Sequence, residues 1–240
     1  MFLSSSLSLA LDRIAERAAD VRRAFTPGAF PRYDDVATPA SSSSFTLDPL
    51  SVAAPEGAYF VTSGEHGERT FTRDGSFALR NGTLTGSEGG AILGIAPRGG
   101  PPAVLRVDPV DAALGRVASP AVEADGSVVY RRETINPRSG AREAQRVVIG
   151  RIALARFPAG TRLEAKGESL VAPPDGVAAQ IGVAGDGTFA ALAPMHRERS
   201  RIDIDESLAR LKEAYLAFDA LQAAEAAKTH LGKTAMDLLK

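Results

Sequence analysis

The apolar residues of this chain change their spacing twice along its length. Near the N-terminus they recur every three or four residues. Between about residues 49 and 194 they alternate in short runs broken by glycine, and after residue 194 the three-and-four spacing returns. A period near 3.6 is typical of an amphipathic helix, whereas a period of two is typical of a strand. The pattern therefore predicts a helix, then a β-rich body, then a second helix.

Residues 1–30 are expected to form the N-terminal helix, which Pro27 and Gly28 stop. Polar residues follow, including four consecutive serines, so residues 31–48 are expected to be a linker. The apolar positions of the helix form a narrow stripe of the kind that packs against one partner helix. They are Leu7, Leu11, Ile14, Ala18 and Val21.

Residues 49–194 are expected to form the β body, because turn signals recur regularly and no helical segments alternate with the strands. Taken alone, Arg73, Asp74 and Gly75 indicate a hairpin turn with exposed charges. Pairs of Asp or Asn with Gly favour tight hairpin turns. Further candidates of this kind are Asn81-Gly82, Asp125-Gly126 and Asp186-Gly187.

Residues 195–240 are expected to form the C-terminal helix, with Asp203 and Glu206 as its cap and Gly232 as a place where it bends. A lone amphipathic helix is marginal in water, so the two stripes should pair with each other or with neighbouring copies. The expected fold class is a mainly β body with N- and C-terminal α-helices that pair as a coiled-coil-like layer, that is, α+β. The apolar stripe of the second helix comprises Leu208, Leu211, Tyr215 and Phe218.

Composition excludes several classes of function. Hydrophobic residues make up 44% and charged residues 24%, which is the balance of a globular chain. A formal net charge of -1 argues against nucleic-acid binding. The absence of cysteine excludes disulfides and thiolate metal sites. Serines interrupt the first apolar stretch and no basic residue precedes it, so no cleavable signal peptide is expected.

No catalytic constellation stands out, and we expect no enzyme, cofactor, metal site or small-molecule substrate. His66, His196 and His230 are assigned to a loop, a loop and a helix, and none has a second ligand three or four residues away. The glycine-rich run at residues 182–187 lies among strand signals without a following helix. Ser63-Gly64 and Ser139-Gly140 lack the glycine pattern of a nucleophile elbow.

Two stretches of the β body carry ordered motifs. Residues 57–94 contain GAYFVT, TFTRDGSFAL and NGTLTGSEGGAILG, and residues 150–171 read GRIALARFPAGTRLEAKGESLV. In this order they resemble the bacterial flagellar basal-body rod and hook proteins. The phenylalanine and short turn of the second stretch favour the distal rod protein over the proximal one. The residues that match the family motifs are Thr72, Arg73, Asp74, Gly75, Phe77, Gly94, Gly167 and Leu170.

The terminal segments resemble the same family less closely. SRIDID from Ser200 is similar to the motif that opens the family's C-terminal helix, and IAERAADV at residues 14–21 is similar to its N-terminal motif. The family's asparagines are replaced here by Glu16, Arg17, Asp20 and Arg201. If those asparagines make contacts between subunits in relatives, this chain must use charge pairs instead.

The resemblance implies a structural subunit of the flagellar basal-body rod. Such a subunit polymerises through its terminal helices into an axial tube that transmits torque, and its partners are further copies and other rod and hook proteins. It also implies unfolded export by the flagellar type III apparatus to the basal body. The alternatives are a proximal rod or hook-type subunit, a β-rich binding module outside the flagellum, and an assembly chaperone or cap.

Overall fold

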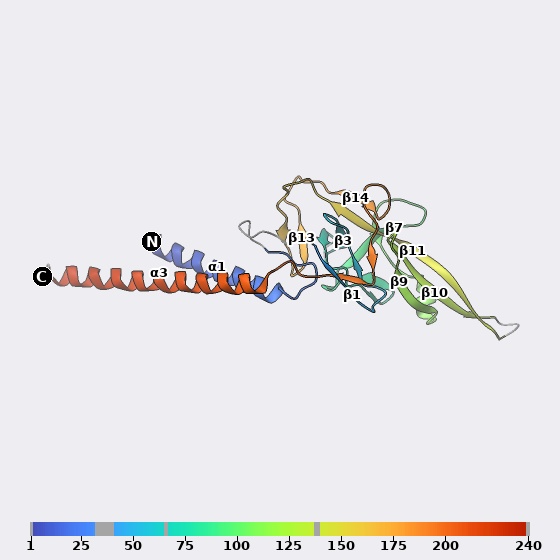
Figure 1. The fold of residues 1–240 in the computed structure, drawn as a ribbon, viewed down its shortest axis with the longest axis horizontal. Helices are drawn as coiled ribbons and strands as arrows, with labels where there is room; N and C mark the ends of the chain where they lie inside the picture. The colour runs from blue at the N-terminus through green and yellow to red at the C-terminus, as the bar shows by residue number, and fades with distance from the viewer. Residues whose placement is uncertain (1, 32–40, 65–66, 137–139, 239–240) are drawn as a thin grey trace. The chain divides into compact units, whose positions relative to one another are not determined.

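The computed structural model describes residues 2–31, 41–64, 67–136 and 140–238 (Figure 1). The fold is mainly β, with 35% of residues in strands and 25% in helices. The chain divides into two compact units. The helical unit comprises Met1–Phe25, Phe30–Pro39 and Ile202–Lys240, and the β unit comprises Thr26–Ala29 and Ala40–Arg201.

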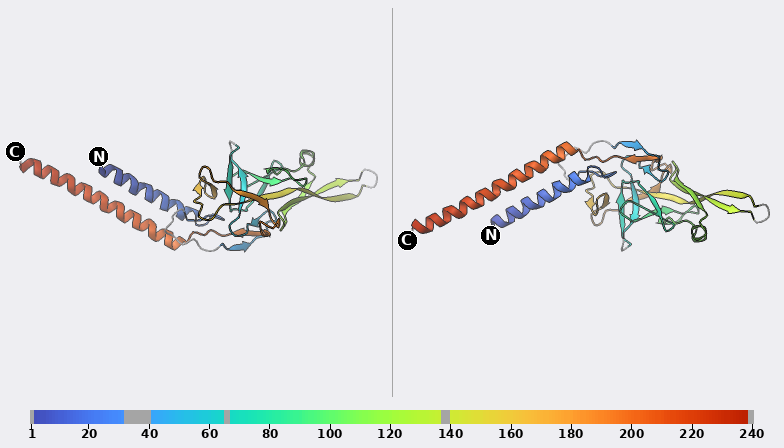
Figure 2. Two further views of the ribbon diagram at one scale, coloured as in Figure 1. Left: turned by 90° about the horizontal axis from the view of Figure 1, so that it is seen from above. Right: turned by 90° about the horizontal axis from the view of Figure 1, so that it is seen from below.

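The helical unit contains α1 (Phe2–Arg23) and α3 (Ile204–Leu238), which run side by side (Figures 1 and 2). The predicted cap of the C-terminal helix is confirmed, because Asp203 Oδ1 accepts hydrogen bonds from the backbone N–H groups of Asp205 (2.9 Å) and Glu206 (3.1 Å). Gly232 lies inside α3 and does not interrupt it.

The expected fold class, with terminal helices paired as a coiled-coil-like layer, is wrong. Leu11 is 52% exposed, and Leu208 and Tyr215 are 47% and 51% exposed, so three of the eight large stripe residues are not covered. Small and charged residues take part in the face between the helices, including Ala10 and Arg17. Such side chains provide few of the bulky knobs that coiled-coil packing requires. The chain is a mainly β protein with one helix near each end.

The β unit contains sixteen short or medium strands and one short helix, α2 (Pro109–Ala113), among the residues described. The strands are β1 (Ser43–Phe45), β2 (Val52–Ala53), β3 (Tyr59–Ser63), β4 (Arg69–Thr72), β5 (Ala78–Arg80), β6 (Thr83–Thr85), β7 (Ala91–Ile95), β8 (Ala103–Val104), β9 (Val117–Val122), β10 (Ser127–Ile135), β11 (Arg142–Arg156), β12 (Glu164–Ala165), β13 (Leu170–Ala172), β14 (Gln180–Val183), β15 (Ala193–Pro194) and β16 (His196–Glu198).

One antiparallel sheet of twelve strands organises this unit, with the path β12-β13-β4-β3-β11-β7-β6-β5. Strand β11 is the central strand of this sheet, because its 15 residues pair with β3, β7, β10 and β14 along its length. Two small sheets, β1-β16 and β2-β15, complete the unit. Strand β1 falls inside the segment that was predicted to be a linker.

The core of the β unit is aliphatic and aromatic. Phe60 and Phe77 pack edge to face with their ring centroids 5.0 Å apart. Around them lie side chains with no exposed surface, and at about 1.5–3 kcal/mol for each large side chain their burial is the main stabilising term. These side chains include Val52, Leu84, Ile92, Ile152 and Leu154.

The four hairpin predictions have different outcomes. Asn81-Gly82 is confirmed as the turn between β5 and β6, with φ of 49° and 74°. Asp125-Gly126 lies in the loop that joins the paired strands β9 and β10. Asp74-Gly75 is not a hairpin, because β4 pairs with β3 and β13 whereas β5 pairs with β6. Asp186-Gly187 follows β14, whose partner is β11, and is not a hairpin turn either.

Candidate assembly surface and the buried Arg73 cluster

The predicted stripe of α1 is divided between two sides of the helix. Ile14 is buried, and Leu7, Ala18 and Val21 are half-buried, whereas Leu11 is exposed. The less exposed side follows the spacing of three and four through Leu7, Ala10, Ile14, Arg17 and Val21. The prediction missed Arg17 because it considered apolar residues only, and it missed Ala10 because the neighbouring Leu11 fits the spacing between Leu7 and Ile14 equally well.

The predicted stripe of α3 is divided in the same way. Leu211 and Phe218 are half-buried, whereas Leu208 and Tyr215 are exposed. The less exposed side is offset by one position and includes Ser207, Leu211, Ala214, Phe218 and Leu221. Large apolar side chains are consequently left on the outer sides of both helices. These exposed side chains are Leu9, Leu11, Leu208, Tyr215, Leu216 and Leu231.

A buried ion pair lies near the C-terminal end of α1. Asp20 accepts a hydrogen bond from the guanidinium of Arg23, and both side chains are buried. A small pocket beside Asp20 is lined by charged residues that include Arg17 of α1, Arg210 of α3 and Asp203, the cap residue of α3. Arg17 and Asp20 are two of the residues that replace asparagines of the family motif, and both lie at this pocket within one chain.

The other charged residue of interest is Arg73, which is buried and not exposed as a hairpin turn would leave it. Its exposed fraction is 3%, and that of Glu198 is 2%. Arg73 Nε donates to both carboxylate oxygens of Glu198 at 2.8 Å, and Arg73 Nη2 lies 2.8 Å from Glu198 Oε2. Arg73 Nη1 donates to the carbonyl oxygen of Ala58 at 2.6 Å, and the guanidinium lies 5.7 Å from the ring centroid of Tyr59. Since all these groups belong to the β unit, Arg73 is an internal anchor for β16.

Further charges extend this cluster towards the surface of the β unit. Arg201 donates to Glu198 Oε1 at 3.0 Å and to Glu56 Oε1 at 3.3 Å. A hydrogen bond from the Ser41 hydroxyl, together with the positive charges of Arg201 and Arg73, lowers the pKa of Glu56, although partial burial acts in the opposite direction. Burial raises the pKa of Tyr59. The carboxylates and guanidiniums therefore alternate along the cluster. We call Arg73, Glu198, Arg201 and Glu56 the Arg73 cluster.

The Arg73 cluster also joins the two segments through which the chain enters and leaves the β unit. Gly28 has a φ of +68°, and a Cβ there would lie 2.6 Å from the carbonyl carbon of Arg73, so only glycine fits without strain. The Arg201 N–H donates to the carbonyl oxygen of Ala29 at 2.7 Å. Residues 26–29 and 198–201 are therefore held together against Arg73.

The remaining motif residues of the first stretch pack around this anchor. The Thr72 hydroxyl accepts a hydrogen bond from the Asp74 N–H at 3.0 Å, and Asp74 is itself buried. Gly75 passes so close to β2 that a Cβ would lie 1.7 Å from the carbonyl oxygen of Val52. Phe77 enters the core against Phe60.

The structure brings part of the second motif stretch to the first. Leu170 of β13 pairs with Thr72 of β4, and Ser169 lies within hydrogen-bonding distance (3.3 Å) of Thr72 through the two hydroxyls. A Cβ at Gly167 would lie 2.0 Å from a carboxylate oxygen of Glu88. Gly94 lies elsewhere, beside β11, where a Cβ would come within 2.5 Å of the carbonyl oxygen of Arg151. Gly75 and Gly94 thus mark close approaches to the backbone of a neighbouring strand, whereas Gly167 lies against the side chain of Glu88.

Several of these partners could not be identified from the sequence. Glu198 lies 125 positions after Arg73, and neither residue stands in a spacing that indicates an ion pair. Asp111, Tyr130 and Arg132 form a second polar cluster that the sequence analysis missed: the Tyr130 hydroxyl donates to Asp111 Oδ2 at 2.5 Å, and Arg132 pairs with the same carboxylate. Asp111 belongs to α2, so this cluster fastens α2 to β10.

Two of the three histidines and the glycine-rich run lie within the described residues. His196 lies in strand β16 and not in a loop, with Nδ1 2.8 Å from the carbonyl oxygen of Pro194; His230 is exposed on α3, and His66 lies outside the described residues. In the run at residues 182–187, Asp186 accepts hydrogen bonds from the N–H groups of Val183, Thr188 and Phe189, so the loop is closed on itself. The portion of the chain that is described contains no group of three potential metal ligands. It also has no helix with the length and hydropathy to span a bilayer.

Comparison with known proteins adds no further assignment. No protein-family model matches the sequence, and no curated protein matches it.

Proposed function

We propose that this chain is a structural subunit of the bacterial flagellar basal-body rod, similar to the distal rod protein. In this proposal copies of the chain polymerise through their terminal helices into an axial tube, together with other rod and hook proteins. The subunit reaches the basal body through the flagellar type III apparatus and performs no catalysis.

The observation that carries the proposal is the set of large apolar side chains left uncovered on the outer sides of α1 and α3. Leu11, Leu208, Tyr215 and Leu216 are each about half exposed. Exposed apolar side chains that gather on one element are typical of protein interaction sites. A contact between different surfaces of identical chains does not close on itself and produces a helical filament.

The two motif stretches, which resemble rod and hook proteins in the same order, support the same proposal. Residues 57–94 and 150–171, which resemble rod and hook proteins, provide β4 and β13 and the buried Arg73, Asp74 and Gly75. The Arg73 cluster holds together the two segments that lead into the helices. A subunit that transmits torque needs these two segments to be held firmly within the β unit, because load on the terminal segments reaches it through residues 26–29 and 198–201.

The proposal is tested by replacing exposed apolar residues of α3. Leu208 and Tyr215 are already about half buried, so their further burial in a polymer contributes about 0.8–1.5 kcal/mol each. Leu208→Asp with Tyr215→Asp should therefore raise the critical concentration for polymerisation at least ~10-fold. Polymerisation is followed by sedimentation and electron microscopy, and swimming is scored in the bacterium that carries the gene.

Leu47→Asp is the matched control, since Leu47 is exposed on the β unit and belongs to neither helix. Undiminished polymers and swimming in the α3 double variant, with circular dichroism showing an unchanged fold, would contradict the proposed role of the helices. Loss of both in the Leu47→Asp control alone would point to a binding surface on the β unit instead.

A further inference from the structure

Strands β10 and β11 extend beyond the other strands of the β unit as a two-stranded arm (Figures 1 and 2). We define the arm as residues 131–135 and 142–146, which pair with each other from Arg131↔Arg146 to Ile135↔Arg142. Strand β9 accompanies β10 only as far as Arg132. The outer part of the arm therefore has no covering strand among the residues described.

The two faces of the arm differ in their surroundings. Residues directly opposite each other in an antiparallel pair share a face, and alternate residues change face. Arg132 is on the face that meets α2, where it pairs with Asp111. The opposite face is not met by α2. It carries Arg131, Glu133, Ile135, Arg142, Ala144 and Arg146, and we call it the basic face.

The charges of the basic face are only partly neutralised. Arg146 Nη2 lies 2.7 Å from Glu123 Oε2, whereas Arg131 and Arg142 have no carboxylate partner in the described part of the chain. Arg131 is also directly opposite Arg146, and like charges at opposed positions destabilise a strand pair. Ile135, at the outer end, is 68% exposed. The basic face thus combines unpaired positive charge with one uncovered apolar side chain.

The rest of the molecule has the opposite charge. Strands β10 and β11 contain six arginines and two glutamates, a net charge of +4, so the remainder of this chain of net charge -1 carries -5. The outer part of the arm has no aromatic side chain for stacking bases, which argues against nucleic acid as its partner. A second copy of the same chain offers the complementary charge.

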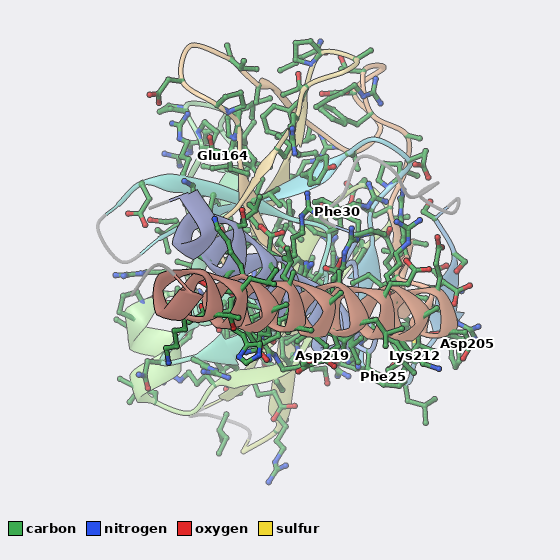
Figure 3. The ribbon with its side chains drawn as sticks, turned by 90° about the vertical axis from the view of Figure 1, so that its left-hand side faces the viewer. Phe25, Phe30, Glu164, Asp205, Lys212 and Asp219 are labelled. Atoms are coloured by element: carbon green, nitrogen blue, oxygen red, sulfur yellow. The ribbon has the colours of Figure 1, made fainter. Side chains whose placement is uncertain are left out.

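Helix α3 has the surface that fits best. Asp205, Glu213 and Asp219 are exposed, and no basic side chain pairs with them in the described residues. Figure 3 shows Asp205 and Asp219 along the same side of α3, together with Lys212. Helix α1 has four arginines against three acidic residues and is a poorer complement. The exposed Leu216 and Tyr215 lie among these carboxylates and provide an apolar surface for Ile135.

We propose that the basic face of the arm of one copy docks on the acidic outer side of α3 of a second copy. This inference rests on the proposed function, because it requires copies of the chain to lie next to one another. Arg131 and Arg142 are about 14 Å apart along the arm at 3.4 Å per residue, and Asp205 and Glu213 are about 12 Å apart along α3 at 1.5 Å per residue. Two ion pairs therefore form at once, and Ile135, which is directly opposite Arg142, lies beside the outer pair, where Tyr215 and Leu216 follow Glu213 on the helix.

The test is a charge exchange in the full-length protein. Arg131→Glu with Arg142→Glu should weaken self-association about tenfold, and Asp205→Lys with Glu213→Lys should weaken it by a similar factor. An equimolar mixture of the two double variants should recover association, because each then meets opposite charge. Sedimentation velocity measures association at about 0.05 M and about 0.5 M salt, and the difference between the wild type and the variants should shrink at the higher salt. Arg98→Glu, an exposed arginine in a turn of the β unit, is the matched control.

The outcomes separate this inference from the proposed function. If the arm variant associates as Arg98→Glu does, the docking is refuted while polymerisation through the helices stands. If the arm variant is weakened but the mixture does not recover, α3 is not the surface that receives the arm. A wild-type protein that stays monomeric at every concentration and salt refutes both.

Discussion

Removing either partner of the buried Arg73–Glu198 pair should destabilise the β unit strongly. With only 3% and 2% of these residues exposed, solvent screens their charges very little. In Arg73→Met the carboxylate of Glu198 keeps one guanidinium, that of Arg201, and the carbonyl oxygen of Ala58 loses its donor. Breaking a buried ion pair from one side costs about 3–5 kcal/mol when the remaining charge is uncompensated, so Arg73→Met should lie at the lower end of this range because Arg201 still pairs with Glu198.

The double replacement Arg73→Met with Glu198→Met should cost less than either single one. Two apolar side chains of similar volume leave no buried charge, and such exchanges are often neutral or stabilising. We expect the double variant to lose at most about 2 kcal/mol, since Arg201 still has Glu56 as a partner. A double variant that is more stable than either single variant identifies a desolvated pair. For a surface pair the two single losses of stability would be small and would add up in the double variant.

Urea denaturation followed by circular dichroism measures the free energy of unfolding, and hydrogen exchange of β3 and β4 reports on the β unit itself. Arg98→Ala is the control and should change the free energy by no more than about 0.5 kcal/mol, because Arg98 is exposed. A loss below about 1 kcal/mol in both Arg73→Met and Glu198→Met would refute the view that this pair is an essential buried anchor.

Three further predictions follow from the geometry. Gly75→Ala should lower the free energy of unfolding by about 3 kcal/mol or more in thermal or urea denaturation, since the new Cβ would overlap the carbonyl oxygen of Val52. Gly232→Ala on α3 has open space for the Cβ and should raise the free energy of unfolding by about 0.5–1 kcal/mol. Equal effects of the two replacements would contradict the close approach at Gly75. Asp20→Ala removes the carboxylate that pairs with the buried Arg23 and should reduce the stability of the helical unit by about 3–5 kcal/mol. The helical circular dichroism signal should then be lost at a lower temperature, whereas Asp12→Ala, at an exposed position, should have little effect. The hydrogen bond from Tyr130, aided by Arg132, lowers the pKa of Asp111. The ionised Asp111 therefore stabilises the fold above pH 3.8, its ordinary pKa, and this stabilisation is lost as the pH falls through the lowered pKa of the folded state. Tyr130→Phe should move acid unfolding to higher pH, and an unchanged acid transition would count against this cluster.

The secondary structure was largely predictable, because it depends on local pattern. The spacing of apolar residues and the cap at Asp203 located α3, and Asn81-Gly82 located the hairpin between β5 and β6. The prediction at Asp74-Gly75 was wrong because its residue types fit a tight turn equally well. Only the pairing of β4 with β13 and of β5 with β6 shows that the two neighbouring strands do not form a hairpin.

The helix stripes show where local pattern is insufficient. Leu11 and Leu208 have the right spacing and the right chemistry for a helix interface, yet Ala10 and Ser207 occupy the less exposed sides. An apolar residue next to an interface and one within it are separated by only 100° of helix rotation. The rotation of each helix depends on how all its side chains fit the partner, and that is a property of the pair.

By itself the sequence determined the order of helix, β body and helix, because periodicity and turn chemistry act between residues that are close along the chain. Only the tertiary structure decided that Arg73 is buried against Glu198, that residues 26–29 meet residues 198–201, and that one face of the arm is left bare. These contacts join residues far apart in the sequence, and charge burial is a property of the space that the whole fold encloses. A short motif therefore identifies an arginine, but the fold decides whether that arginine is a surface charge or an anchor.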